Sequence, residues 1–407
     1  MKKNLSTFVE KSKFQIFLKR LSILYNCKLF FDYPKKSKIL FYDPFVSNIY
    51  FDIFKKLRFQ TLDTRLKNIY FIIVLRAIYR KFKKKNLSLK ENYIIEYIKE
   101  NNPEHIISFT NVDLFFWTLK NYFPDKKFYL FQASSINGWG QNQFERYKSE
   151  YKKRNKIDYI FPWGKGLFRK YKSVLDCNLI DAGSLLNNSV PNSKIKINKR
   201  YIIFLSQYKK QTSFIRTNEN KIVDQNSTYH DQRKHVLKIL HEFCIKNNFK
   251  LKIFPRSFKK DDWENENLYF QRMFKNIKLV LIKRNHKKQI YDCLSKYQNF
   301  VVIDSSAGYE ALARGKRVCF LNIKKSFSNY YDSGDHRYGW PLKFSKNKNF
   351  WSSSHKKKSI ERALNFAFFT SDSNWKKVKK KYIDPVIIYD PLNKKLFNNL
   401  KKIGFNL

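Results

Sequence analysis

Residues 299–323 read NFVVIDSSAGYEALARGKRVCFLNI, and this stretch decides the fold class of the chain. The apolar run Phe300–Ile303 is rich in β-branched residues and predicts a buried strand. Ser305 and Ser306 can cap a helix start, because a serine oxygen accepts a hydrogen bond from a first-turn N–H. The residues from Ala307 to Arg314 strongly favour a helix. Gly315 favours the left-handed conformation that ends a helix, and a second apolar run follows. Strand, capped helix, glycine stop and strand form a βαβ unit, which predicts a parallel sheet buried on both faces.

The same unit brings polar groups to the carboxyl end of its first strand. Ser305, Ser306 and Gly308 would place small hydroxyls and bare backbone N–H groups at a helix N-terminus, which favours phosphate binding. Glu310 lies close enough behind them to accept hydrogen bonds from a ribose diol. The alternative interpretation is an ordinary βαβ unit with a good cap, because Gly308 stands alone and no GxGxxG fingerprint is present.

Short strands and helices alternate through most of the chain. Segments of helical character separate apolar runs of strand length, which indicates the α/β fold class. We therefore predict two Rossmann-like, doubly wound domains facing a cleft. The predicted strands are residues 38–43, 59–62, 105–109, 127–132, 159–161, 178–181, 201–205, 251–254 and 277–282.

A polar stretch around Pro191, without any apolar period, divides the chain. It predicts an N-terminal domain at 1–186, a linker at 187–200 and a C-terminal domain at 201–380. Residues 381–407 form a last segment with helical character.

The chain is strongly basic. Its 407 residues include 83 Lys and Arg against 33 Asp and Glu, a formal charge of +50. Such a charge suggests nucleic acid or an anionic membrane as a partner. The lysines are spread along the chain, and Lys, Asn, Ile, Phe and Tyr are all abundant. We therefore infer that AT-rich codons are the main source of the positive charge. A distributed basic surface would still attract anionic lipid headgroups.

The cysteines and the apolar runs bear on the compartment. Five widely spaced cysteines without a CxxC pair argue for a reducing compartment and against structural zinc. Charge interrupts the N-terminus before the apolar core of a signal peptide forms. The longest uncharged apolar run, Ile69–Leu75, is far below the roughly 18–20 residues of a membrane span. We expect a cytoplasmic protein, peripheral on the inner face of the cytoplasmic membrane.

The stretch SSAGYEALARGKRVCF, residues 305–320, resembles the donor-binding motif of GT-B glycosyltransferases. The chain also resembles the surface carbohydrate biosynthesis proteins of bacterial O-antigen, lipopolysaccharide and capsule loci. The resemblance implies that the serines and Gly308 meet donor phosphates, that Glu310 contacts the ribose, and that the last helix crosses back to the first domain. The matching pieces are LDTR (62–65), SFTNVDLFFW (108–117), FYLFQASS (128–135), DAGS (181–184), YGWPLKF (338–344) and FW (350–351).

Further donor-side candidates follow the strands of the second domain, since ligands of open α/β sheets lie beyond the carboxyl ends of strands. Gln207 follows the first strand. Arg256 follows LKIFP, and its guanidinium fork matches phosphate geometry, although a surface arginine is the alternative. His336, in GDHRYGWP, could meet the leaving phosphate or the sugar, and an exposed loop histidine is equally compatible.

Candidates in the first domain would serve the acceptor. An inverting sugar transfer needs a base that takes a proton from the acceptor hydroxyl, and Asp113 and Asp63 are our catalytic candidates. Asp113 could instead support a helix start, and Asp63 could form an ion pair with Arg65. Asn111 and Gln132 are predicted to line the acceptor side of the cleft.

The function predicted from these features is a metal-independent GT-B glycosyltransferase without a cofactor. Its donor would be a nucleotide sugar, either a CMP-linked acidic sugar or a UDP-sugar. Its acceptor would be a surface polysaccharide or a lipid-linked glycan, met at an anionic membrane surface.

Two alternatives remain open. One is another sugar-nucleotide enzyme on the same scaffold, an epimerase or a polyol-phosphate transferase. The other is a basic nucleic-acid-binding protein, although no RNP, KH or zinc-finger pattern is present and we expect no specific nucleic acid partner.

Overall fold

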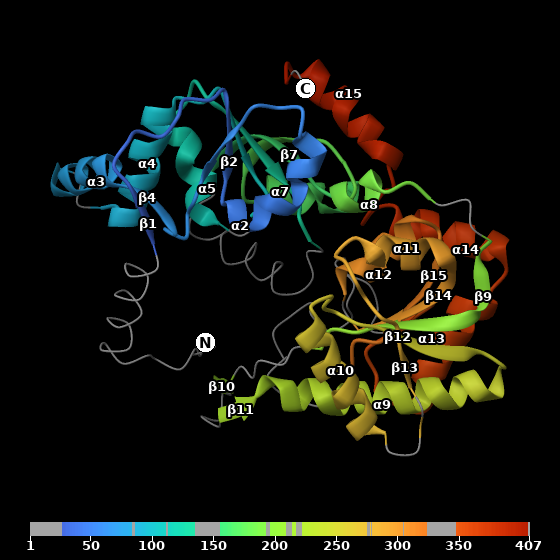
Figure 1. Cartoon of the computed structure of the whole chain (residues 1–407). Coiled ribbons are helices and arrows are strands. Elements are labelled where there is room, and N and C mark those ends of the chain that lie inside the picture. Colours follow the sequence, from blue (N-terminus) through green and yellow to red (C-terminus); the bar gives the residue numbers. More distant parts are fainter. Residues whose placement is uncertain are drawn as a thin grey trace, which may run out of the picture. The chain divides into compact units, whose positions relative to one another are not determined.

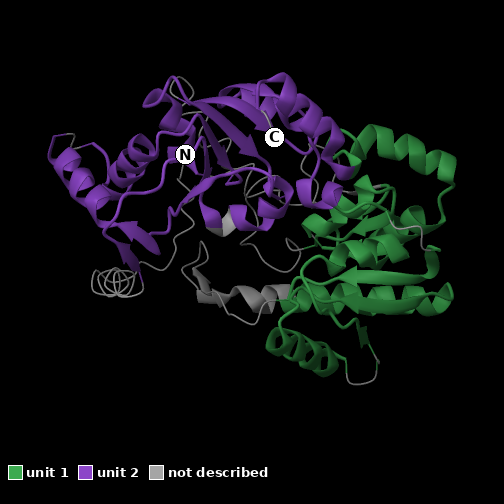
Figure 2. Cartoon of the chain, turned by 45° about the horizontal axis from the view of Figure 1, so that its top comes forward, with its two compact units in different colours: residues 1–10, 135–142, 190–391 green, residues 11–134, 143–189, 392–407 purple. Residues whose placement is uncertain are grey.

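The structure is a computed structural model, and it divides the chain into two compact units (Figure 2). Within the described residues, unit 1 holds 190–391, and unit 2 holds 27–134, 155–189 and 392–405. The residues that the structure describes are 27–83, 86–110, 113–134, 155–192, 196–208, 214–216, 222–274, 277, 279–303, 305–323 and 347–405.

Unit 1 is built on a doubly wound sheet with the order β13-β12-β9-β14-β15-β17-β16. All neighbouring strands are parallel except β16, which pairs antiparallel with β17. The strand order reverses between β9 and β14. The strands are β9 (Asn198–Leu205), β12 (Lys250–Phe254), β13 (Val280–Leu281), β14 (Tyr297–Val302), β15 (Arg317–Phe320), β16 (Asn347–Lys348) and β17 (Trp351–Ser352).

Helices cover both faces of this sheet, with α9 and α13 on one face and α11 and α12 on the other (Figure 1). A small hairpin, β10 (Phe214–Arg216) with β11 (Ile222–Asp224), precedes α9. The helices are α9 (Gln225–Lys246), α10 (Lys260–Met273), α11 (Gln289–Lys296), α12 (Ser306–Ala313), α13 (Lys357–Phe369), α14 (Asp372–Val378) and a π-helical turn at Lys379–Ile383.

The segment β14–α12–β15 is the βαβ unit predicted from residues 299–323. Ser305 is the N-cap of α12, and its hydroxyl accepts a hydrogen bond from Ala307 N–H at 3.3 Å. Gly315 ends the helix with a φ of 80°. A Cβ on Gly308 would lie 2.8 Å from Val302 Cγ2, so glycine is what lets α12 approach the sheet this closely.

Unit 2 is built on a second parallel sheet, with the order β3-β2-β5-β6-β7-β8. Its strand order reverses between β2 and β5. The predicted fold class, two doubly wound α/β units, is confirmed. The strands are β2 (Ile39–Tyr42), β3 (Gln60–Leu62), β5 (His105–Ser108), β6 (Lys127–Phe131), β7 (Lys156–Phe161) and β8 (Asp176–Leu179), and a separate parallel pair joins β1 (Lys28–Phe30) to β4 (Asn68–Tyr70).

Several of the helices of unit 2 are short, and α3 and α4 pack against each other. Ser88 caps α4 through a reciprocal capping box with Glu91. The helices are α2 (Pro44–Ser47), α3 (Phe71–Lys83), α4 (Leu89–Asn101), α5 (Leu114–Thr118), α7 (Phe168–Lys172), α8 (Leu185–Ser189), α15 (Lys394–Lys402) and the 3-10 turns η1 (Asn48–Phe54), η2 (Leu119–Asn121) and η3 (Lys165–Leu167).

The core of unit 2 is aromatic and includes the last helix. Tyr50 stacks on Phe109 with ring centroids 4.0 Å apart. From α15 and the residues after it, Leu396, Leu400 and Phe405 join the same buried cluster. Helix α15, near the end of the sequence, therefore completes the core of unit 2, although most of that core comes from the first half of the chain.

The stretch 187–200, assigned to a linker from its polarity, begins inside α8 and ends inside β9. Asn187 and Asn188 are fully buried there. The Asn188 side-chain amide donates to Ala182 C=O at 2.8 Å, which offsets the cost of burying it. Polarity alone is thus a poor guide to exposure at this point of the chain.

Among the described residues, no helix combines the length and apolarity that spanning a membrane requires.

Candidate functional site

Each sheet has one place where a ligand is expected. In open α/β sheets ligands bind beyond the carboxyl ends of the strands, where the strand order reverses. In unit 1 this place lies beyond β9 and β14, and we call it the unit 1 edge: Ser206, Gln207, Arg256, Ser305 and Ser306. In unit 2 it lies beyond β2 and β5, and we call it the unit 2 edge: Asp43, Asp63, Arg65, Thr110 and Asp113.

Gln207 is the second residue after β9, at the unit 1 edge. Its backbone C=O accepts a hydrogen bond from the Arg233 guanidinium at 3.2 Å. Its side-chain Oε1 is buried and has no hydrogen-bond partner among the described residues. A buried acceptor without a partner costs free energy, so Oε1 is suited to a ligand hydroxyl or amino group.

Arg256 follows β12, and its backbone is held from two sides. Its N–H donates to the Glu266 carboxylate at 3.1 Å, and its C=O accepts from the Arg284 guanidinium. The Arg256 side chain itself is exposed. The turn therefore fixes the backbone while the side chain is exposed, which suits an anion clamp.

Glu266 is the residue at this edge that the sequence analysis missed. It lies on α10 and is 1% exposed. Burial raises the pKa of its carboxyl to about 7, against the opposite effect of Ser206 and of the charges of Arg233 and Arg256. A buried carboxyl with a raised pKa beside two arginines is a feature of functional sites.

A sequence signal for Glu266 does exist. Trp263, Phe270 and Met273 follow a helical spacing of apolar residues, and Glu266 occupies the same face. A carboxylate in the middle of an apolar helical face needs a polar partner in the fold, and here the partner is the turn that carries Arg256.

Ser305 and Gly308 have partners within the first turn of α12. Ser305 Oγ accepts from Ala307 N–H, and Gly308 N–H donates to Ser305 C=O at 3.0 Å. The expectation that Gly308 offers a bare N–H is therefore wrong, because its N–H is bonded and its missing Cβ serves packing. Phosphate binding by Ser305, Ser306 and Gly308 stays a prediction.

Glu310 is buried on α12 and has an internal partner. The Tyr291 hydroxyl of α11 donates to Glu310 Oε1 at 3.3 Å. The guanidinium of Arg314 lies 5.5 Å from the Tyr291 ring centroid. Glu310 thus helps to join α11 to α12, and its predicted contact with a ribose stays a prediction.

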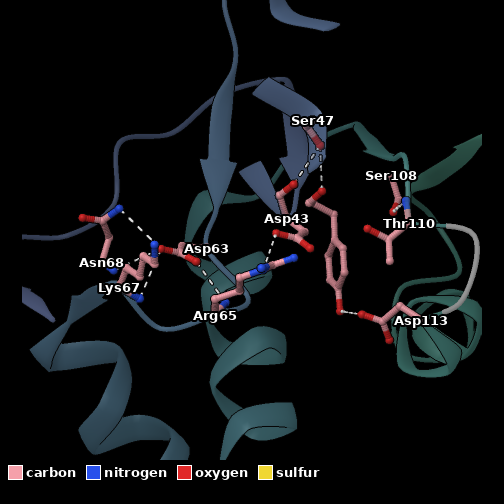
Figure 3. A network of polar contacts seen from close by, with 10 residues as sticks. Asp43, Ser47, Asp63, Arg65, Lys67, Asn68, Ser108, Thr110 and Asp113 are labelled. Carbon is pink, nitrogen blue, oxygen red and sulfur yellow. Dashed lines mark hydrogen bonds and ion pairs between the residues drawn. The ribbon is translucent and has the colours of Figure 1, made fainter. Parts of the chain in front are cut away.

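At the unit 2 edge, Asp113 is the N-cap of α5 (Figure 3). Its Oδ1 accepts from Phe115 N–H at 3.0 Å and Phe116 N–H at 3.3 Å. Its Oδ2 accepts from the Tyr42 hydroxyl at 2.8 Å. Burial and the Asp113 carboxylate raise the pKa of Tyr42. The alternative expectation of a helix-start role for Asp113 is confirmed.

Asp63 organises the loop between β3 and β4 (Figure 3). Its Oδ1 accepts from Arg65 N–H at 2.9 Å, and its Oδ2 accepts from Lys67 and Asn68 N–H, both at 3.2 Å. The expected Asp63–Arg65 ion pair is wrong: the Arg65 guanidinium lies 3.7 Å from Asp43 Oδ1, because the backbone turn already occupies the Asp63 carboxylate.

Asp43 is the second functional candidate that the sequence analysis missed. It directly follows β2, where the strand order of unit 2 reverses, it is buried, and it has a φ of 55°. The Ser47 hydroxyl donates to Asp43 C=O at 3.0 Å and stabilises this turn (Figure 3). A left-handed aspartate before a proline costs of order 1–3 kcal/mol, a strain that is common at functional sites.

Gln132, expected on the acceptor side, holds Trp163 in place. Its Oε1 accepts from Trp163 N–H at 2.9 Å, and its C=O accepts from the indole N–H at 2.8 Å. Asn111 and His336 lie outside the described residues.

Within the described part of the chain, no three His, Cys, Asp or Glu side chains are grouped closely enough to hold a metal ion.

Comparison with known proteins gives one family match. A family model for O-antigen biosynthesis proteins matches residues 134–404. No curated protein sequence matches the chain.

The chain is also similar to solved structures over most of its length. A glycosyltransferase from Rickettsia africae shares 12% identity at a TM-score of 0.47, with 92% of this chain and 100% of that chain covered. S. aureus MnaA with UDP shares 10% identity at 0.48, covering 92% and 98%. The wall teichoic acid polymerase TagF shares 9% identity at 0.44, covering 97% and 98%.

Proposed function

Because the chain belongs to the family of O-antigen biosynthesis proteins, we propose that it is a glycosyltransferase that moves a sugar from a nucleotide-sugar donor to a surface polysaccharide or lipid-linked glycan. The family match confirms the resemblance seen in the sequence. The observation that carries the proposed activity is the unit 1 edge, where an exposed arginine and an unpartnered buried acceptor lie beyond a doubly wound sheet.

The donor would bind at the unit 1 edge. Arg256 would bind the diphosphate or monophosphate, because a guanidinium offers paired donors to phosphate oxygens. The hydroxyls of Ser305 and Ser306 would add neutral donors. Gln207 Oε1 would accept a hydrogen bond from a hydroxyl or amino group of the nucleoside or sugar. These contacts suit a CMP-linked acidic sugar or a UDP-sugar.

The acceptor would bind at unit 2, with Asp43 as the base. Its carboxylate would take the proton of the acceptor hydroxyl while that oxygen forms a bond to the anomeric carbon. The bond between the anomeric carbon and the phosphate oxygen would break, and the nucleotide would leave with its negative charge. In this scheme Arg256, in place of a metal ion, balances that charge.

Asp63 and Asp113 take positioning roles in this scheme. Asp63 shapes the loop that carries Arg65, the ion-pair partner of Asp43. Asp113 accepts a hydrogen bond from the hydroxyl of Tyr42 and so fixes this side chain. Tyr42 directly precedes Asp43 in the chain. A direct catalytic role for either aspartate stays a prediction.

The place of action would be the inner face of the cytoplasmic membrane, with the protein peripheral. The charge of +50 supports attraction to anionic headgroups, which is long-range and needs no specific pocket.

The test is a thermal-shift panel of CMP, CDP, UDP, GDP and ADP on the wild type and two matched variants. Arg256→Ala removes the proposed clamp. Arg200→Ala removes an exposed arginine near the opposite end of β9 and is the control for charge. A nucleotide at 100 times its Kd adds about 2.7 kcal/mol to the free energy of unfolding.

We expect one nucleotide to stabilise the wild type and Arg200→Ala but to stabilise Arg256→Ala much less. Equal responses of both variants, or equal responses to every nucleotide, would mean that charge alone binds the ligands. Product analysis with the labelled donor then separates sugar transfer from epimerisation and from polyol-phosphate transfer.

A further inference from the structure

Helix α3 presents a stripe of large apolar side chains to the outside of unit 2. The exposed fractions of these side chains range from 38% to 78%. At 3.6 residues per turn, their positions fall within an arc of about 100°. The α3 stripe consists of Phe71, Leu75, Ile78, Tyr79 and Phe82.

The opposite face of α3 provides the buried contacts of this helix without the stripe. Ile73 and Ala77 are fully buried, and α3 packs along α4. On the flank, Arg80 pairs with Glu96 at 3.1 Å, and Arg76 pairs with Glu100. The stripe is therefore not needed to attach the helix, and contiguous exposed apolar surface of this kind usually marks an interaction site.

The stripe continues onto the segment after β1. Phe31 is 68% exposed, and its ring lies 5.6 Å from the ring of Phe71. Because β4 leads directly into α3, the β1–β4 pair holds this second aromatic beside the first turn of the helix.

Positive charge borders the carboxyl end of the stripe. Lys83 Nζ lies 4.5 Å from the Tyr79 ring centroid, and Lys81 Nζ donates to Leu87 C=O at 2.6 Å. In sequence, residues 80–85 read RKFKKK, so Phe82 stands among five basic residues. Lysines can extend along apolar surface while keeping their ammonium groups in a polar layer.

We propose that the α3 stripe is a membrane-docking face that inserts its Phe, Leu, Ile and Tyr side chains between the headgroups of an anionic bilayer. An apolar face with a lysine-rich border is the composition of helices that lie in the membrane interface. Aromatic rings with a polar edge are suited to the headgroup level. The lysines at its border would meet the lipid phosphates.

A second copy of the chain is the competing occupant, and charge disfavours it. A two-fold dimer would bring two copies of the same basic border together, each on a chain of charge +50. An anionic surface instead offers the complementary sign. The inference rests on the peripheral location given in the proposed function and adds the face that makes the contact. Docking on lipid requires no nucleotide, so this inference and the proposed sugar transfer can fail separately.

The test is co-sedimentation of the full chain with vesicles of phosphatidylcholine alone and with 30% phosphatidylglycerol, at about 0.15 M salt. The test variant is Leu75→Ser with Phe82→Ser. The matched control is Ile245→Ser with Leu268→Ser, which changes exposed apolar residues of α9 and α10. Melting curves check that both variants stay folded, as expected for exposed positions.

We expect binding to the phosphatidylglycerol vesicles that falls about 10- to 100-fold in the stripe variant and stays unchanged in the control, because each large apolar side chain adds substantial burial. Equal binding by both variants would overturn the proposal, since charge alone would then explain it. So would a wild type that ignores these vesicles. A wild-type dimer that the stripe variant turns into a monomer, without a change in vesicle binding, would assign the stripe to a second copy.

Discussion

The carboxyl edges of the two sheets follow the same topological rule but use their polar side chains differently. At the unit 2 edge, Asp63 and Asp113 together accept hydrogen bonds from five backbone N–H groups of their own turns. At the unit 1 edge, Gln207 Oε1 has no partner among the described residues and the Arg256 side chain is exposed.

Side-chain length explains much of this difference. An aspartate just after a strand is short enough to bond the N–H groups two or three residues on, and such turns capture it. Glutamine and arginine reach past their own turn and leave polar atoms at the sheet edge. The aspartates that look most catalytic in the sequence are therefore the ones that build loops, and Asp43 differs through its left-handed backbone.

The largest effect is expected from Asp43→Asn. Asparagine tolerates the left-handed conformation but is a poor base, so kcat/KM should fall about 10²- to 10⁴-fold while the fold is kept. Transfer of the labelled sugar, with the donor found in the thermal-shift panel, measures this. Activity within a few-fold of the wild type would remove Asp43 from the mechanism, and a larger loss in Asp113→Asn would move the base there.

The next effect concerns pH and Glu266. Its pKa is raised from 4.5 to about 7 in the folded chain, so the folded state binds more protons than the unfolded state between these values. Stability is therefore highest at low pH in this window and falls as pH rises. From pH 5 to pH 8 the contribution lost is about 2 to 3 kcal/mol.

Urea unfolding of the wild type and Glu266→Gln at pH 5, 6, 7 and 8 measures this difference. The glutamine variant keeps an acceptor for Arg256 N–H but does not ionise, so its stability should fall less across the range. Parallel curves for the two proteins would show that Glu266 does not titrate in this window.

The loop-building roles at the unit 2 edge predict different losses of stability. Asp63→Ala leaves three N–H groups without their acceptor and should cost about 2 kcal/mol. Asp113→Ala removes one helix cap and also leaves the buried Tyr42 hydroxyl without its acceptor, so it should cost about 2 to 3 kcal/mol. Chemical denaturation compares the two, and a clearly smaller loss for Asp113→Ala than for Asp63→Ala would contradict the roles drawn from their hydrogen bonds.

The smallest effect is expected from Gly308→Ala. The added methyl would crowd Val302 and Phe320, which costs about 1 to 3 kcal/mol, whereas a better helix former returns up to about 1 kcal/mol. A net loss of about 1 kcal/mol in unfolding experiments is expected, with nucleotide binding kept. Loss of nucleotide binding at unchanged stability would instead favour a direct phosphate role.

The sequence was sufficient for those parts of the fold that local rules determine. Most strands of both sheets and the capped helix α12 follow from apolar runs, a serine cap and Gly315. The short strands β16 and β17 lie where the sequence predicts no strand. Helix α10 was missed because its acidic and amide residues hide the spacing of Trp263, Phe270 and Met273. The polarity of Asn187 and Asn188 in α8 predicts a linker, because the hydrogen bonds that allow their burial form only in the folded chain.

The candidate site was less accessible from sequence. Arg256 and Gln207 follow from their places after strands, but Asp43 and Glu266 owe their interest to a backbone angle and to a pKa raised by burial. The burial of Glu266 depends on how α10 packs in the folded unit, and the backbone angle of Asp43 belongs to a turn that Ser47 stabilises only once it has formed. Residue type and order do not contain them.

The position of α15 determines when the core of unit 2 can be completed during synthesis. Unit 2 obtains its last core residues, Leu396, Leu400 and Phe405, only after residues 190–391 have been made. At about 5–20 residues per second, the ribosome needs about 10–40 s for that interval. During that time the aromatic core of unit 2 lacks these three side chains. Most of unit 2 is therefore synthesised first, but its core is completed last.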